Sequence, residues 1–187
     1  MKRILTIGIL FATTLIPVHA ATAASPRSAP HALARFGSAQ LDLGQSWGSA
    51  KACLVQDSGV TCFATEADLN AFIAAPADAS GGIVSQVAAA AGTFSALSEC
   101  GTYLRLYSST GYGGSLLAIA TELNWINLSA YGFDNTTSSY RIGDCAATFR
   151  DGSNGGGATY TGPTGAGVSA SSMVSGWDNR VSSIYIS

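Results

Sequence analysis

The stretch that decides the fold lies near the C-terminus, at residues 176–183, and reads Gly176-Trp177-Asp178-Asn179-Arg180-Val181-Ser182-Ser183. An earlier copy occupies residues 132–139 and reads Gly132-Phe133-Asp134-Asn135-Thr136-Thr137-Ser138-Ser139. In both copies a glycine and an aromatic residue precede Asp-Asn, two variable residues follow, and Ser-Ser closes the cluster. The two clusters stand 44 residues apart. This repetition predicts two similar structural units, each ending in a group of oxygen-bearing side chains.

A second repeated pattern marks the beginning of each unit. Tyr107, Tyr112 and Gly114 open the first unit, and Phe149 and Gly156 open the second, 42 residues later. In the second unit Asn154 stands where the second aromatic residue is expected. Alternating runs at residues 103–107, 140–142 and 184–186 are separated by glycine-rich turns, which is typical of short strands. Residues 98–187 are therefore expected to form an all-β sandwich or barrel.

Taken together, the two patterns resemble the βγ-crystallin family. The Greek-key motif of that family has an aromatic residue, four residues, an aromatic residue, one residue and a glycine. Its microbial members also carry a calcium clamp, with two Asn or Asp residues, two variable residues, Ser or Thr, and then Ser. Residues 134–139 and 178–183 match the clamp throughout. The resemblance covers residues 98–187 and implies a double Greek-key β-sandwich with four strands in each unit.

The resemblance also implies two calcium sites that share ligands between neighbouring clamps. The hydroxyl ligands would come from Ser138 and Ser182, and the loop carbonyl ligands from Thr136 and Arg180. The side-chain acid or amide ligands would come from one member of each Asp-Asn pair, and the sequence leaves open which member. The candidates are Asp134, Asn135, Asp178 and Asn179.

The residue types themselves also fit calcium. Ca²⁺ takes six to eight oxygen ligands from carboxylates, amides, carbonyls and waters. Each cluster offers only one carboxylate, so we expect dissociation constants at the weak end of the range, roughly 10⁻⁵ to 10⁻³ M. The competing interpretation is that Asp, Asn and Ser simply form turns. Two matched clusters favour calcium as the bound ion.

The four cysteines, Cys53, Cys62, Cys100 and Cys145, predict disulfides, with three possible pairings. We favour Cys53–Cys62, which would close a hairpin, and Cys100–Cys145, which would link equivalent positions ahead of the two repeats. A zinc site is the alternative, but the cysteines lack paired short spacing and have no histidine nearby.

The first 20 residues are typical of a secretory signal. Lys2 and Arg3 precede a short apolar core, and cleavage is expected after residue 20 or as late as residue 24. The protein is therefore expected to be secreted and extracellular, without a membrane span. Removal of the signal leaves 7 basic and 11 acidic residues, a net charge of −4, with the basic residues scattered. Nucleic acid is thus not an expected partner.

Between the signal and the sandwich we expect three segments. Residues 21–40 are rich in Ala, Ser and Pro and predict a flexible region. Residues 41–75 predict a small disulfide-linked unit, with strands at 52–55 and 60–63 and a helix over 66–74 that begins at an N-cap, Thr65. Residues 76–97 are dominated by Ala, Ser and Gly and predict a linker.

An enzyme is not expected, since the two histidines, His19 and His31, lie in the signal and in the predicted flexible region. Histidine-based triads and zinc sites are therefore missing from the predicted folded part. The favoured function is a monomeric, calcium-stabilised extracellular protein. The alternative is a proteinaceous inhibitor of extracellular metalloproteases or other proteases, an idea that depends on analogy of fold alone. A toxin of crystallin fold is a third, weaker candidate.

Overall fold

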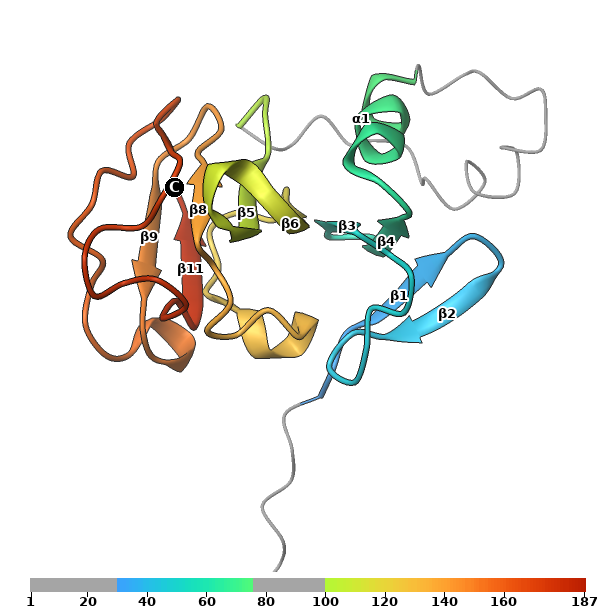
Figure 1. Ribbon diagram of the computed structural model, residues 1–187, viewed down its shortest axis with the longest axis horizontal. Coiled ribbons are helices and arrows are strands. Elements are labelled where there is room, and N and C mark those ends of the chain that lie inside the picture. The colour runs from blue at the N-terminus through green and yellow to red at the C-terminus, as the bar shows by residue number, and fades with distance from the viewer. Residues whose placement is uncertain (1–29, 76–99) are drawn as a thin grey trace, which may run out of the picture.

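A computed structural model of the protein describes residues 30–75 and 100–187 (Figure 1). The predicted signal peptide and the predicted linker at 76–97 lie outside the described residues. Within the described ranges, every helix is too short or too polar to cross a bilayer. The chain is mostly β, with one α-helix in the described part, as the sequence predicts.

Two Greek-key units build a sandwich from residues 104–186. The strands of the first unit are β5 (Leu104–Ser109), β6 (Gly113–Ile119), β7 (Ile126–Asn127) and β8 (Ser139–Arg141). Those of the second unit are β9 (Ala147–Arg150), β10 (Ser169–Ala170) and β11 (Ser183–Ile186). The remaining strand of the second unit is reduced to a single bridge between Arg150 and Thr159. The predicted double Greek-key architecture is confirmed.

The two units exchange one short strand each. β10 of the second unit pairs antiparallel with β8, and β7 of the first unit pairs antiparallel with β11. One sheet therefore contains the order β10-β8-β5-β6, and the other contains β7-β11-β9. Because each unit completes the other's sheet, the two units form one sandwich and not two separate modules.

Both units begin with the same folded hairpin. Tyr112 and Asn154 stand at equivalent points and both have a left-handed backbone, with φ of 63° and 52°. Asparagine tolerates this conformation well, which explains how it replaces the expected aromatic residue. Asn154 forms two hydrogen bonds of 2.7 Å with the Asn127 side chain. Its backbone nitrogen donates to Oδ1 of Asn127, and its own Oδ1 accepts from Nδ2 of Asn127. The hairpin of the second unit thus forms without its second aromatic ring.

An N-terminal unit widens the first sheet. It contains β1 (Leu33–Phe36), β2 (Ala39–Asp42), β3 (Ala52–Gln56) and β4 (Gly59–Phe63). β3 pairs parallel with β6 of the sandwich, β4 pairs with β3, and β1 pairs parallel with β4. The result is an eight-stranded sheet in the order β10-β8-β5-β6-β3-β4-β1-β2. The predicted strands at 52–55 and 60–63 are present, and both favoured disulfides are confirmed.

The prediction of a flexible region over 21–40 is wrong where the structure describes it, because β1 and the start of β2 fall inside it. β1 is a strand of four residues, too short to show a clear alternating pattern. It is held by its parallel ladder with β4, a partner some 25 residues away that a local pattern does not reveal. His31, also assigned to that region, lies 3.2 Å from the Asp42 carboxylate.

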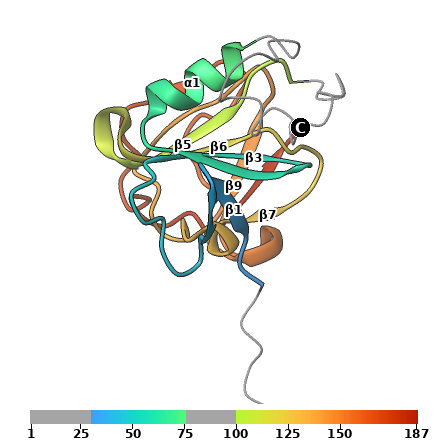
Figure 2. The same ribbon diagram turned by 90° about the vertical axis from the view of Figure 1, so that its right-hand side faces the viewer.

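Helix α1 (Glu66–Ala74) has the predicted bounds and covers the outer face of the eight-stranded sheet (Figure 2). Thr65 caps it, since its hydroxyl accepts a hydrogen bond from the backbone nitrogen of Asp68 at 3.1 Å. Leu69 is fully buried in a cluster with Leu54 and Leu116. Alternate residues of the same strands, such as Val55 and Leu117, face the second sheet. Burial on both faces explains the continuous apolar runs of β3 and β6.

Buried tyrosines make the fold sensitive to alkaline pH. Burial raises the pKa of Tyr140, whose hydroxyl donates a 2.6 Å hydrogen bond to the Pro163 carbonyl, and also raises the pKa of Tyr107 and Tyr131. In the unfolded chain these groups ionise near pH 10. Their contribution to stability is therefore complete below about pH 9 and decreases as the pH rises beyond about 10.

Urea unfolding between pH 7 and 11 measures this effect. We expect the midpoint to decrease above about pH 9.5, and a Tyr140→Phe variant to lose less stability between pH 9 and 11 than the wild type. A midpoint that stays constant to pH 11 would contradict the assignment.

Candidate metal centre

The two clamp clusters lie in loops that lead into the last strand of each unit. Residues 134–138 precede β8, and residues 178–182 precede β11. Asn135 and Asn179 both have a left-handed backbone, with φ of 53° and 54°. Asparagine is enriched in this conformation, so the repeated Asp-Asn pair specifies the same turn twice. The clamps therefore match in backbone shape as well as in sequence.

The clamps lie side by side and bind each other through their backbones. The backbone nitrogen of Asn135 donates to the Val181 carbonyl at 3.0 Å. The backbone nitrogen of Asn179 donates to the Thr137 carbonyl, also at 3.0 Å. Each bond is the counterpart of the other under the 44-residue repeat. The two loops are thus related by an approximate two-fold exchange.

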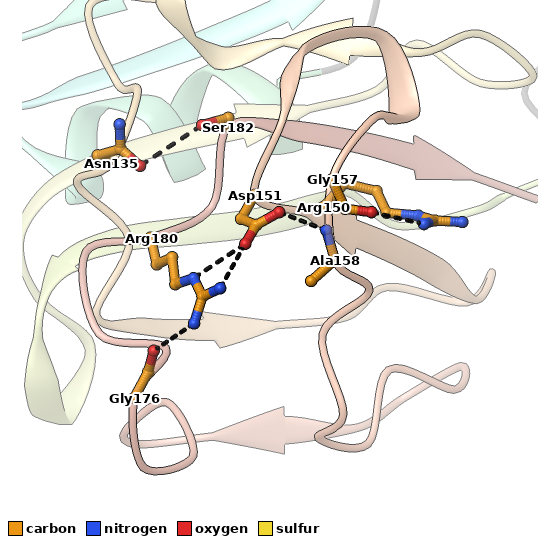
Figure 3. Close-up of polar contacts among 8 residues, drawn as sticks. All are labelled: Asn135, Arg150, Asp151, Gly157, Ala158, Gly176, Arg180 and Ser182. Atoms are coloured by element: carbon orange, nitrogen blue, oxygen red, sulfur yellow. Dashed lines mark hydrogen bonds and ion pairs between the residues drawn. The ribbon is translucent and has the colours of Figure 1, made fainter.

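The side chains repeat this reciprocal arrangement. The Ser138 hydroxyl lies 3.3 Å from Oδ1 of Asn179, and the Ser182 hydroxyl lies 3.4 Å from Oδ1 of Asn135. Figure 3 shows the second of these pairs. Each clamp hydroxyl therefore stands next to an amide oxygen of the opposite clamp. The asparagines, and not the aspartates, reach across.

The aspartates occupy a different place. Asp134 and Asp178 are exposed, and one carboxylate oxygen of each lies 3.2 Å and 3.4 Å from the amide nitrogen of the asparagine that follows it. They flank the cross-clamp pairs and add negative charge beside them. Which member of each Asp-Asn pair faces the opposite clamp could not be deduced from the sequence, because the turn geometry decides it.

The two serines of each Ser-Ser pair have different surroundings. Ser139 and Ser183 are completely buried and donate hydrogen bonds to backbone carbonyls in the folded hairpins, Ser109 at 2.6 Å and Gly152 at 2.5 Å. They also accept backbone hydrogen bonds from residues 112 and 155 at 3.1 and 3.0 Å. The second serine of each pair thus fastens a hairpin to its clamp, a role that the clamp motif alone does not indicate.

Removing one of these hydroxyls leaves partly buried backbone groups without this partner. We expect Ser183→Ala to lower the free energy of unfolding by about 2 kcal/mol, since an unsatisfied buried polar group costs about 1–3 kcal/mol. Ser187→Ala, on the exposed last residue, is the control and is expected to stay within about 0.5 kcal/mol. Chemical denaturation of the two variants measures the difference, and equal stabilities would contradict the fastening role.

The two remaining predicted positions differ in their side chains. The Thr136 hydroxyl donates to the backbone carbonyl of Asp134 at 3.0 Å and stays within its own loop. Arg180 points away from the cross-clamp pairs and binds the carboxylate of Asp151 at 2.6 Å. The guanidinium, with the backbone nitrogen of Ala158, lowers the pKa of Asp151. Neither repeated motif includes Asp151. The sequence feature that could have pointed to it is an acidic residue two positions after the aromatic start of the second unit, where the first unit has Ser109.

A second group of metal-ligating residues consists of Cys100, Glu122 and Cys145, whose ligand atoms lie within 4.8 Å of one another. The two sulfur atoms, however, are joined in a disulfide, and zinc and similar metals bind the thiolate form of cysteine. Glu122 accepts a 3.2 Å hydrogen bond from the Cys100 backbone nitrogen. In this disulfide form the three residues are not a metal site, and the Cys100–Cys145 bond instead links the two units.

No model of a protein family matches the sequence, and no curated protein matches it. Among solved structures, the N-terminal domain of protein S is 19% identical over 46% of this chain and 96% of that chain, with a TM-score of 0.39. A βγ-crystallin domain from Flavobacterium johnsoniae is 25% identical over 45% and 92%, with a TM-score of 0.37. A clostrillin double mutant in complex with nickel is 14% identical over 46% and 97%, with a TM-score of 0.36.

The strand order and the repeated motifs of the chain itself carry the classification of its fold. Two units that start on a folded hairpin, exchange a short strand and end in matched clamps form the double Greek-key sandwich that the motifs predict. Residues 104–186 thus form a double Greek-key sandwich of the βγ-crystallin type, with an N-terminal unit added to one of its sheets.

Proposed function

We propose that this protein is a secreted calcium-binding protein that holds two Ca²⁺ ions between its paired clamps and is stabilised by them. The observation that carries the proposal is the reciprocal pairing of Ser138 with Asn179 and of Ser182 with Asn135, at 3.3 and 3.4 Å. Each pair places two side-chain oxygens from different loops together, beside an exposed carboxylate. Hydroxyls, amide oxygens and carboxylates are the ligand types that Ca²⁺ prefers.

The residues present fit the ion in number as well as in kind. Each site would take one hydroxyl, one amide oxygen and the loop carbonyl of Thr136 or Arg180, with waters completing six to eight ligands. Asp134 and Asp178 would supply charge from outside the pairs. With one carboxylate per site, the expected dissociation constants are of the order of 10⁻⁵ to 10⁻³ M.

Stabilisation follows because the ligands come from two different units. An ion held between the clamps binds only the folded arrangement and so favours it over the unfolded chain. At a calcium concentration tenfold above the dissociation constant, each site would add about 1.4 kcal/mol to the free energy of unfolding. An extracellular setting agrees with the two disulfides and supplies calcium continuously.

Calorimetric titration of the full chain with calcium tests the proposal. We expect two ions per chain for the wild type, and loss of measurable binding at millimolar calcium for the Asn135→Ala/Asn179→Ala double variant. Asp57→Ala, in the turn between β3 and β4, removes a carboxylate far from the clamps and is expected to bind like the wild type. Absence of binding heat in the wild type at 10 mM calcium would refute the proposal.

Inhibition of extracellular proteases remains the alternative from the sequence. The glycine-rich loop at residues 161–165 is one candidate for contact with a protease. The Tyr140 hydroxyl donates to the Pro163 carbonyl of this loop at 2.6 Å, and the Ala147 backbone nitrogen donates to the Thr164 carbonyl at 2.9 Å. Incubation with a panel of extracellular proteases distinguishes the two functions, since cleavage of the protein without loss of protease activity rejects inhibition.

A further inference from the structure

The repeat breaks at one point beside the clamps. Arg180 in the second clamp corresponds to Thr136 in the first, and Asp151 in the second hairpin corresponds to Ser109 in the first. The second unit has therefore gained one positive and one negative side chain together. Both lie next to the same clamp, so this difference between the units has consequences for one proposed calcium site more than for the other.

The two charges form a well-defined ion pair (Figure 3). Nε and Nη2 of Arg180 donate to Oδ2 of Asp151 at 3.0 and 2.6 Å. Nη1 donates to the Gly176 carbonyl at 3.3 Å, and the guanidinium carbon lies 4.9 Å from the centre of the Trp177 ring. Four contacts thus hold the arginine side chain in one orientation across the outside of the second clamp.

Asp151 is equally well fixed, and the residue before it, Arg150, contacts Ser182. The Ser182 backbone nitrogen donates to the carbonyl of Arg150, the residue before Asp151, at 2.8 Å. The other oxygen of the carboxylate, Oδ1, accepts from the Ala158 backbone nitrogen at 2.5 Å. The first unit has no carboxylate at the corresponding position. Asp151 is therefore an acidic residue in the loop that adjoins Ser182, and Arg180 binds its carboxylate.

We propose that Arg180 acts as a tethered cation that makes the two calcium sites unequal, an inference that depends on the proposed function. The guanidinium points away from the Asn135–Ser182 pair, but it neutralises the carboxylate of Asp151 and adds a positive charge to the clamp that carries Ser182. The Asn179–Ser138 pair has a neutral threonine at the corresponding position. Since the number of charged ligands tunes calcium affinity, the Asn179–Ser138 site binds calcium more tightly and fills first.

The same geometry assigns a latent role to Asp151. Without the arginine, its Oδ2 is free, while Oδ1 remains held by Ala158. A free carboxylate in the loop that adjoins Ser182 then becomes available to the Asn135–Ser182 site as a charged oxygen ligand. The ion pair with Arg180 thus prevents Asp151 from acting as a calcium ligand.

Calorimetric titration with calcium chloride at fixed ionic strength tests the inference on the full chain. The wild type is expected to show two binding steps that differ by about tenfold or more in dissociation constant. Ser182→Ala should remove the weaker step, and Ser138→Ala the tighter one. Arg180→Gln should tighten the weaker step by about tenfold, and Arg35→Gln, which removes the same charge from β1 in the N-terminal unit, should not.

Asp151→Asn completes the comparison. Alone, this substitution removes the carboxylate that neutralises Arg180. We expect it to weaken the weaker binding step about tenfold. Combined with Arg180→Gln, it should abolish the gain that Arg180→Gln produces, because the latent ligand is gone. Two equal sites that do not respond to Arg180→Gln would overturn the inference while leaving calcium binding intact. If the Asp151→Asn/Arg180→Gln double variant still binds calcium more tightly at the weaker step, the role of Asp151 is overturned. Absence of calcium binding in the wild type would instead reject the proposed function.

Discussion

Replacement of both Cys100 and Cys145 by serine is expected to lower the free energy of unfolding by about 4 kcal/mol. This disulfide spans 45 residues and joins the segment before β5 to the segment before β9, which are equivalent points of the two units. Without it the unfolded chain gains the freedom of a long loop. The two units exchange strands of only two residues each, β7 and β10, so the covalent link supports an interface with few ladder bonds.

The Cys53–Cys62 bridge is the natural control. It joins directly opposite residues of β3 and β4 and spans only nine residues, so its removal is expected to cost about 3 kcal/mol. Urea unfolding of both variants in oxidising buffer gives the two values. A smaller loss for the long bridge than for the short one would contradict the view that it restricts the unfolded chain.

Replacement of Trp47 by alanine is expected to lower the free energy of unfolding by about 3 kcal/mol, the lower end of the range for removing a large aromatic side chain. Trp47 belongs to the N-terminal unit, and its ring lies 5.6 Å from that of Phe133, the residue just before the first clamp. Its Nε1 donates to the Tyr131 carbonyl at 2.8 Å. One side chain thus fastens the added unit to the sandwich at a second place, away from the β3–β6 ladder.

Trp47→Phe separates the two contributions of this residue. It keeps most of the ring contact and loses the hydrogen bond, so we expect a loss of about 1 kcal/mol. Thermal unfolding of both variants should show a single transition, because the N-terminal unit and the sandwich share one sheet and one core. Two separate transitions in the wild type would show that residues 30–75 unfold independently and would contradict this account.

Local chemistry made much of the fold predictable. The β3–β4 hairpin follows from two apolar runs around a turn-prone set, and α1 begins at the capping threonine that the sequence indicates. The sandwich follows from two patterns, the aromatic-glycine start and the clamp, that each occur twice at nearly the same spacing. In each case the pattern itself lies within one short local segment, and the sandwich needs in addition that each pattern recurs.

What could not be predicted depends on contacts between distant segments. The parallel pairings of β1 with β4 and of β3 with β6 turn a short, unremarkable segment into part of an eight-stranded sheet. In the clamps, the sequence shows which oxygens are present, but the left-handed turns decide that Asn135 and Asn179 face the opposite clamp. The pairing of Asp151 with Arg180 joins residues 29 apart and has no counterpart in the first unit.

The most direct test of the central claim is a crystal structure of the protein grown with calcium, with the ions located by their anomalous scattering. We expect two calcium peaks, each about 2.3–2.6 Å from a serine hydroxyl oxygen of one clamp and from the asparagine Oδ1 of the other. The pairs to be bridged are Ser138 with Asn179 and Ser182 with Asn135. Peaks bound only by the exposed Asp134 and Asp178 carboxylates, or no peak between the clamps at 10 mM calcium, would contradict it.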